Sequence, residues 1–239
     1  MAKASTPHSL YLPETSARYQ ALKTTDGATI EISPESQVYA RDFAIRLGGS
    51  NPPPPLPKAS TPGGRTVSKP TEEYIPKPQP SGAALIIDYG PPATIPTNSL
   101  RGIKSHTRVS PLESPGTTDI SADVDFIALA EAAINASPGV EVHGPVDQAR
   151  FLTAMGIEER VAQLVKRAVD RERGGGVEGE KERLTELVKR VEGGWKRLVD
   201  KGPQGMGRLY QVMAVVPHFP VKEGETRGRP VGFGGDVLL

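Results

Sequence analysis

One alternating segment and one capped helix stand out in the first third of the chain. Residues 28–32 alternate apolar and polar side chains, which predicts a short strand. A helix is predicted next, with Ser33 as its cap, Pro34 at its first position and Glu35 near the positive end of its dipole. The glycines at 48–49 are expected to end this helix.

The strongest strand prediction covers residues 82–90. Leu85, Ile86 and Ile87 form a continuous apolar run, which is typical of a strand buried on both faces. Because a helix, a loop and such a strand follow one another, the pattern favours an α/β fold. Asp88 ends the run, and ligands of open α/β sheets bind beyond the carboxyl ends of strands. Asp88 is therefore a candidate for chemistry, with loop capping or pairing with a base as the alternative.

The second half of the chain predicts several helices and two strands. Asp125 precedes a predicted helix over 126–136, so a capping role competes evenly with a functional one. Alternation predicts a strand over 140–143, and Gly144-Pro145 is expected to open a helix that stops near Gly156. The remaining predicted elements are helices within 157–168 and 184–198 and a final strand over 207–217.

Composition narrows the class of protein. The 239 residues carry 29 Lys and Arg against 28 Asp and Glu, which argues against a strongly basic nucleic-acid binder or a polybasic membrane anchor. The absence of cysteine excludes disulfides, thiolate metal sites and a cysteine nucleophile. No apolar run approaches the roughly 18 residues that span a bilayer, and the first residues lack the apolar core of a secretory signal.

Proline and glycine divide the chain into segments. Residues 50–81 are rich in proline, with four in a row at 52–55, and predict a disordered insertion; a ligand for SH3 or WW domains is the alternative. Residues 1–27 show no sustained period and are expected to be poorly ordered, and the glycine-rich residues 220–239 to form a flexible tail. Residues 28–49 and 82–219 are left as the folded domain.

Common catalytic motifs are missing. The sequence has no Walker A loop, no GxSxG and no HExxH, and the glycine run that begins at Gly174 is not preceded by the convincing strand that a dinucleotide-binding GxGxxG requires. Asp119, Asp123 and Asp125 lie within seven residues, but the glycine and the closing glutamate of a calcium loop do not follow. We therefore expect no metal site.

Several stretches together resemble the MidA-like family of S-adenosylmethionine-dependent methyltransferases. Each is weak alone, but their order and spacing make the resemblance specific. They are Ile30–Glu35, Gly82–Gly90, Leu100-Arg101-Gly102 with His106, Pro115-Gly116, Asp119–Phe126, Gly144-Pro145 with Gln148, Phe151-Leu152, Met155–Ile157, Met206-Gly207 and Ala214–His218.

The resemblance implies a fold. It predicts a partial Rossmann-like sheet of the class I methyltransferase type, with appended C-terminal helices. Members of the family carry a glycine-rich cofactor loop, which lies N-terminal to the stretches matched in this sequence. Nothing in residues 1–27 matches that loop, so we expect this chain to be the C-terminal half of the enzyme and to bind S-adenosylmethionine weakly or not at all by itself.

The resemblance also implies an activity. It predicts symmetric dimethylation of arginine on a complex I subunit in the mitochondrial matrix, with S-adenosylmethionine as co-substrate and a protein as partner. No nucleic-acid partner and no membrane span are expected. The alternative is a non-catalytic assembly or scaffold protein that keeps the partner-binding half of the fold.

Candidate site residues follow from the matching stretches. Asp88, Asp119 and Asp125 are the carboxylates that fall in them, and acidic side chains can hold a guanidinium through two hydrogen bonds. We expect Asp88 to lie nearest the cleft and Asp119 or Asp125 to shape the substrate side. Candidate substrate-binding residues are Tyr89, His106, Phe126 and Gln148.

Overall fold

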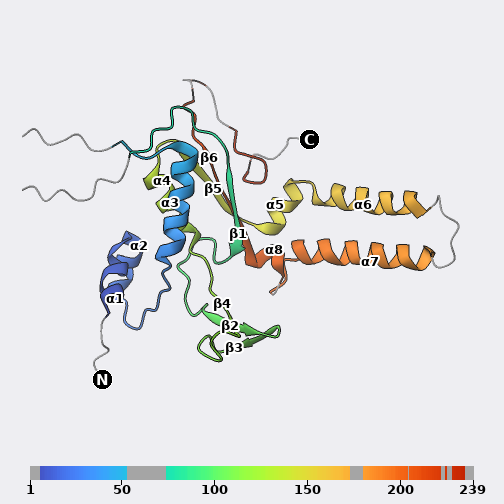
Figure 1. The fold of residues 1–239 in the computed structure, drawn as a ribbon, viewed down its shortest axis with the longest axis horizontal. Coiled ribbons are helices and arrows are strands. Elements are labelled where there is room, and N and C mark those ends of the chain that lie inside the picture. The colour runs from blue at the N-terminus through green and yellow to red at the C-terminus, as the bar shows by residue number, and fades with distance from the viewer. Residues whose placement is uncertain are drawn as a thin grey trace, which may run out of the picture.

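The computed structural model describes residues 6–52, 74–172, 180–203, 205–221, 224 and 228–234. Most of the proline-rich stretch within 50–81 and part of 220–239 lie outside these residues, so both of those predictions stay untested. Over the described residues the fold is mixed α/β, with two small sheets, helices packed on the larger one and a helical arm that projects from it (Figure 1).

The main sheet consists of three strands in the order β1-β6-β5. These are β1 (Ala84–Tyr89), β6 (Tyr210–Pro217) and β5 (Val140–Asp147). The central strand β6 is antiparallel to both neighbours, so β1 and β5 run parallel to each other. The predicted α/β class is confirmed, whereas the Rossmann-like sheet stays a prediction.

A smaller sheet follows β1 in the sequence. It contains β2 (Arg101–Lys104), β3 (Thr107–Val109) and β4 (Asp119–Ser121), all antiparallel, in the order β3-β2-β4. Ser105 and His106 form the tight turn between β2 and β3, both with positive φ. Register pairs Arg101 with Ser121 and thereby brings the start of β2 beside the segment that leads into the next helix.

Two capped helices cover one face of the main sheet. In α3 (Pro34–Gly48) the Ser33 side chain accepts a hydrogen bond from the Ser36 amide, which confirms the predicted cap. The second helix, α4 (Phe126–Ala136), packs along α3 and over β5. Their apolar faces and the inward side of the sheet form two adjoining core clusters, built from Ala40, Phe126, Leu129 and Met213 and from Ala44, Ala133, Val140 and Val215.

The opposite face of the sheet is only partly covered. Phe151 of α5 (Gln148–Ala154) and Phe233 pack there against β6. The cover stops short of β1, where Leu85 and Ile87 remain 51% and 46% exposed. The prediction that this strand is buried on both faces is therefore wrong for the described residues, because β1 is the edge strand and only its other face lies under helices.

The predicted strand over 28–32 and the predicted helix start at Gly144-Pro145 are both wrong. Residues 28–32 form no strand; instead the Glu31 amide bonds to the carbonyl of Pro96. Gly144-Pro145 does not open a helix, because β5 continues through it with an irregular register. The helix α5 begins only after Asp147, whose carboxylate caps it by accepting from the Arg150 amide at 2.9 Å.

Short helical turns precede α3, and a long arm follows α5. The turns are α1 (Pro7–Tyr11), η1 (Leu12–Glu14), α2 (Ala17–Gln20) and η2 (Ala21–Thr24), in the segment whose sequence predicts poor order. The arm consists of α6 (Ile157–Glu172) and α7 (Glu180–Val199), and α8 (Met206–Leu209) leads from it into β6 (Figure 1). Within the described residues, no helix is long and apolar enough to cross a membrane.

Two helical glycines should respond to alanine in opposite ways. A Cβ on Gly48 would lie 2.7 Å from the Gly139 carbonyl carbon and 2.8 Å from Val140 Cγ1, so Gly48→Ala should destabilise the fold by about 1–3 kcal/mol. A Cβ on Gly193, inside α7, would meet nothing within 4 Å, so Gly193→Ala should stabilise by about 0.5–1 kcal/mol. Urea denaturation followed by circular dichroism measures both; equal effects would contradict this account of the α3 contact.

Candidate functional site

Asp88 lies at the carboxyl end of β1, where the sequence predicted a functional carboxylate. Its Oδ1 accepts a hydrogen bond from the Tyr89 amide at 2.8 Å. Burial raises the pKa of Asp88 and the neighbouring Asp123 raises it further, while the Tyr89 amide and Arg101 act in the opposite direction. Asp88 is therefore a half-buried carboxylate whose ionised form is disfavoured, and a further cation beside it would stabilise that form.

A guanidinium group lies near enough to Asp88 to lower its pKa, although among the described residues no ion pair joins the two. Arg101 Nη1 donates to Asp123 Oδ1 at 2.8 Å, and its Cζ lies 4.6 Å from the centroid of the Tyr89 ring. We call Asp88, Tyr89, Arg101 and Asp123 the guanidinium cluster. It combines two carboxylates with an aromatic face, which is the chemistry that binds arginine side chains.

Glu31 fixes the loop that carries this cluster. Its Oε1 accepts from the amides of Ser99 and Leu100 at 2.9 and 3.0 Å, and its Oε2 accepts from the Ser99 hydroxyl. That hydroxyl in turn accepts from the Asp123 amide at 2.8 Å. Burial alone would raise the pKa of Glu31, but these hydrogen bonds together outweigh it and the pKa lies below its usual range. Arg101 and Asp123 are thus held from both sides.

Asp125 is committed to intramolecular partners. It caps α4 by accepting from the Ala128 amide at 3.1 Å. Both of its oxygens also bind Arg18 Nη1, at 2.9 and 3.1 Å, and Oδ2 accepts from the Tyr19 hydroxyl at 3.0 Å. Burial and the adjacent carboxylate raise the pKa of Tyr19 well above its usual range, which keeps it a donor. Of the two roles left open for Asp125, the geometry favours the structural one.

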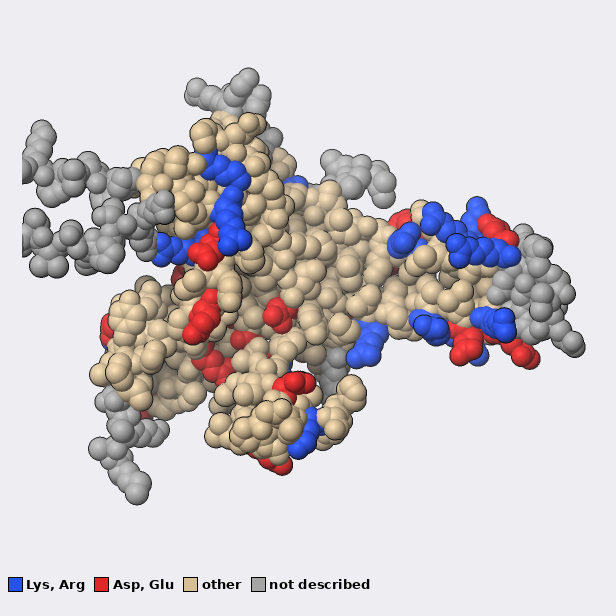
Figure 2. Space-filling model, in the orientation of Figure 1, with Lys and Arg blue, Asp and Glu red and all other residues tan. Residues whose placement is uncertain are grey.

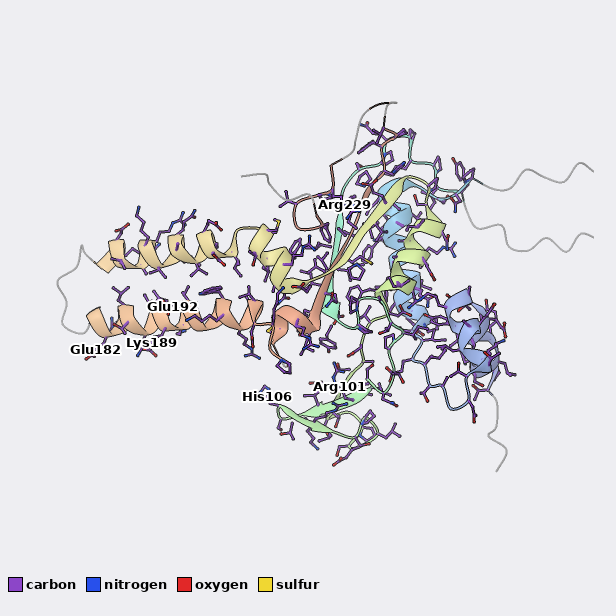
Figure 3. All side chains as sticks on the ribbon, turned by 180° about the vertical axis from the view of Figure 1, so that it is seen from behind. Arg101, His106, Glu182, Lys189, Glu192 and Arg229 are labelled. Atoms are coloured by element: carbon purple, nitrogen blue, oxygen red, sulfur yellow. The ribbon has the colours of Figure 1, made fainter. Side chains whose placement is uncertain are left out.

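The other predicted site residues are scattered. Asp119 is exposed at the start of β4, and His106 is exposed in the β2–β3 turn, which Figure 3 shows at the far end of the hairpin from Arg101. Phe126 is fully buried in the core, and Gln148 is buried with its amide donating to the Leu198 carbonyl at 2.9 Å. Of the seven candidates, only Asp88 and Tyr89, which are consecutive in the sequence, belong to the guanidinium cluster.

Three residues of the site were not among the candidates. Arg101 and Asp123 lie in the family-like stretches, and Glu31 lies in the first of them, so the signal was present in the sequence. Their roles depend on contacts between residues 22 and 68 positions apart, which local patterning does not reveal.

A large cavity opens at the same end of β1. It has a volume of about 790 Å³ and lies between the small sheet, the loop after β1 and the base of the arm. Its charged lining residues are Arg101, Arg108, Arg197, Arg208 and Asp123. A second cavity of about 320 Å³ lies between α3 and α4 and includes Glu31, Asp123 and Asp125. Figure 2 shows several acidic side chains between α2, α3 and the small sheet, and others along the arm.

Comparison with known protein families gives one match that covers the site. The model of an S-adenosyl-L-methionine-dependent methyltransferase family matches residues 1–146, which include the whole guanidinium cluster. The chain belongs to this methyltransferase family.

Curated members of this methyltransferase family share a substantial part of the sequence. The mitochondrial protein arginine methyltransferase NDUFAF7 homolog of Caenorhabditis elegans is 32% identical over 152 residues, which cover 64% of this chain and 31% of that protein. NDUFAF7 of Rattus norvegicus is 35% identical over 62% of this chain and 29% of its own length, and that of Mus musculus 38% identical over 57% and 27%. The matched part thus spans less than a third of these relatives.

Neither of these two cavities fits the co-substrate of the methyltransferase family. S-adenosylmethionine has a net positive charge at neutral pH, because its sulfonium and ammonium groups outweigh its single carboxylate, and the larger cavity has an excess of arginines that would repel it. The one carboxylate in that lining, Asp123, is already paired with Arg101. In the smaller cavity Glu31, Asp123 and Asp125 all have intramolecular donors or ion pairs, and no glycine lines it. We therefore assign no step of the reaction to a cofactor bound in these cavities.

Replacing Glu31 should loosen the cluster in a pH-dependent way. Glu31→Gln weakens the three hydrogen bonds from Ser99 and Leu100 and should lower the free energy of unfolding by about 1 kcal/mol at neutral pH. Because the folded pKa of Glu31 is depressed, its stabilisation is present above the unfolded pKa and is lost as the pH falls through the folded one. Urea denaturation between neutral and acidic pH measures the difference between the two proteins.

Glu113→Gln is the matched control, because Glu113 is exposed. Its stability should follow that of the unmodified protein across the same pH range. A pH-independent difference for Glu31→Gln would contradict the role given to the Glu31 carboxylate.

Proposed function

We propose that this chain is the substrate-binding part of an S-adenosylmethionine-dependent protein arginine methyltransferase. It acts in mitochondria, and its substrate is a subunit of respiratory complex I that becomes symmetrically dimethylated. Membership of the methyltransferase family and the names of the arginine methyltransferase relatives support this proposal. The observation that carries it is the half-buried Asp88 carboxylate of the guanidinium cluster, in which Asp123 and the Tyr89 ring already hold the guanidinium of Arg101.

Asp88 would orient the substrate arginine. An arginine side chain has a pKa above about 12, so it arrives as a cation and its nitrogen must be aligned for attack. An ionised Asp88 can accept two N–H bonds from the guanidinium and hold it in one plane. Asp123 and the Tyr89 ring already restrain Arg101, so that Asp88 is the carboxylate of the cluster left for a second guanidinium.

The main sheet would be one side of a larger sheet. β1 and β5 are parallel and are connected by a long crossover that contains α4, as in doubly wound folds. The open edge and uncovered face of β1 would then receive the strands and helices that hold S-adenosylmethionine. Methyl transfer requires that part in addition to the residues described here.

A scaffold that retains the partner-binding surface is the second candidate. The observation that favours it is the poor fit of both cavities to S-adenosylmethionine. Under this reading the guanidinium cluster binds an arginine of the partner without modifying it.

Replacement of Asp88 separates the two functions. In the longest natural polypeptide that contains residues 1–239, incubated with radiolabelled S-adenosylmethionine and complex I subunits, Asp88→Asn should reduce arginine methylation about 10- to 100-fold, as expected for loss of a charged hydrogen-bond acceptor. Because the pKa of Asp88 is raised, the unmodified enzyme should lose activity as the pH falls through a value above the ordinary range for aspartate. The variant should lack this acid limb.

Asp170→Asn is the control, since Asp170 is exposed on α6. If the unmodified protein methylates the subunit and Asp88→Asn methylates it at the same rate, Asp88 does not orient the substrate arginine. If the unmodified protein binds the subunit but methylates nothing, the scaffold function holds and the enzyme proposal fails.

A further inference from the structure

Four arginines from four different elements converge on the larger cavity. Arg101 comes from β2, Arg108 from β3, Arg197 from α7 and Arg208 from α8. Figure 2 shows basic side chains on the small sheet and near the base of the arm. The fold thus gathers positions that are about a hundred residues apart in the sequence, and the lining carries three positive charges in excess of the single Asp123.

Three of these arginines are available to a ligand. Arg101 is paired with Asp123 at 2.8 Å. Among the described residues, no ion pair or hydrogen bond engages the guanidinium groups of Arg108, Arg197 or Arg208; the Gln211 amide donates only to the backbone carbonyl of Arg208, and all three arginines are exposed. The rest of the wall is apolar or neutral, with prolines of the loop after β1 and the rings of Tyr89 and Tyr210. The cavity is therefore a basic recess with little internal compensation.

We propose that this recess binds an acidic segment of the protein substrate, next to the arginine that Asp88 receives. Guanidinium groups bind carboxylates through paired N–H bonds, and several carboxylates on one segment could engage the three free arginines together. A volume of about 790 Å³ fits several side chains of a peptide rather than a single ion. The inference rests on the proposed function for the protein that carries the segment and for the arginine that Asp88 receives.

The charges of the site explain why the segment must be acidic. A substrate arginine that approaches Asp88 comes close to Arg101 and to the basic recess, which repel it. Carboxylates beside the target arginine would neutralise the recess as the guanidinium reaches Asp88. An arginine flanked by basic residues would meet like charges on both sides, so the recess selects against it.

Binding of two matched peptides to the full 239-residue chain tests the proposal. One fluorescent peptide carries a central arginine flanked by glutamates, and the other has every glutamate replaced by glutamine. Fluorescence anisotropy should show tighter binding of the glutamate peptide, with affinity that falls as salt is added. Arg108→Gln, Arg197→Gln and Arg208→Gln should each weaken it about two- to fivefold, and the triple variant at least about tenfold.

Arg190→Gln is the matched control, because Arg190 is exposed on the same helix as Arg197 but does not line the recess. Equal binding of the two peptides, or a triple variant that binds as the unmodified chain does, would overturn the proposal. Displacement of the peptide by inorganic phosphate at matched ionic strength, or tighter binding of a single-stranded oligonucleotide, would also overturn it by showing a general anion site or a nucleic-acid site.

The readout is independent of methylation. If the glutamate peptide binds through the arginines but no arginine is methylated, the recess stands and the enzyme proposal fails. If methylation proceeds and depends on Asp88 while the two peptides bind equally, the enzyme proposal stands and the proposal for the recess fails.

Discussion

The pairing of β6 between β1 and β5 is the constraint on which the rest of the structure depends. Residues 84–89 and 140–147 belong to one sheet because residues 210–217 of β6 hydrogen-bond to both. This pairing sets Asp88 opposite Gln211 and places the start of β6 and α8 beside the end of β1. The cavity walls, the half-buried carboxylate and the base of the arm all follow from it.

The second level of organisation is electrostatic. Glu31, placed by a loop rather than by a strand, holds Ser99, and Ser99 holds the amide of Asp123. Asp123 in turn fixes Arg101 over the Tyr89 ring. Asp88 is left half-buried at the edge of this chain of contacts, with its ionised form disfavoured by burial. A cation that binds beside Asp88 would stabilise its ionised form, whereas carboxylates that bind in the recess would offset the positive charge of its arginines.

The sequence predicts locally determined features well. Ser33 and Asp125 specify helix starts through short-range hydrogen bonds and Pro34 through its fixed φ, and those starts are confirmed. Prediction fails where a tertiary contact decides. Residues 28–32 alternate like a strand, but the Glu31 side chain instead binds the loop at Ser99. The apolar run at 85–87 predicts burial on both faces, but it lies in an edge strand with one exposed face. For the site, Asp88 is predictable from its place after a strand, but the pairing of Arg101 with Asp123 requires the register of the small sheet.

The pKa of Asp88, measured from its carboxyl carbon by nuclear magnetic resonance with and without methylguanidinium, tests the central claim most directly. The account predicts a pKa above the ordinary aspartate range in the free protein and a clear decrease on addition of the cation, because binding favours the ionised carboxylate. The carboxyl signal of the exposed Asp170 should not respond. An Asp88 pKa that stays the same at saturating methylguanidinium would contradict the assignment of Asp88 as the group that receives the substrate arginine.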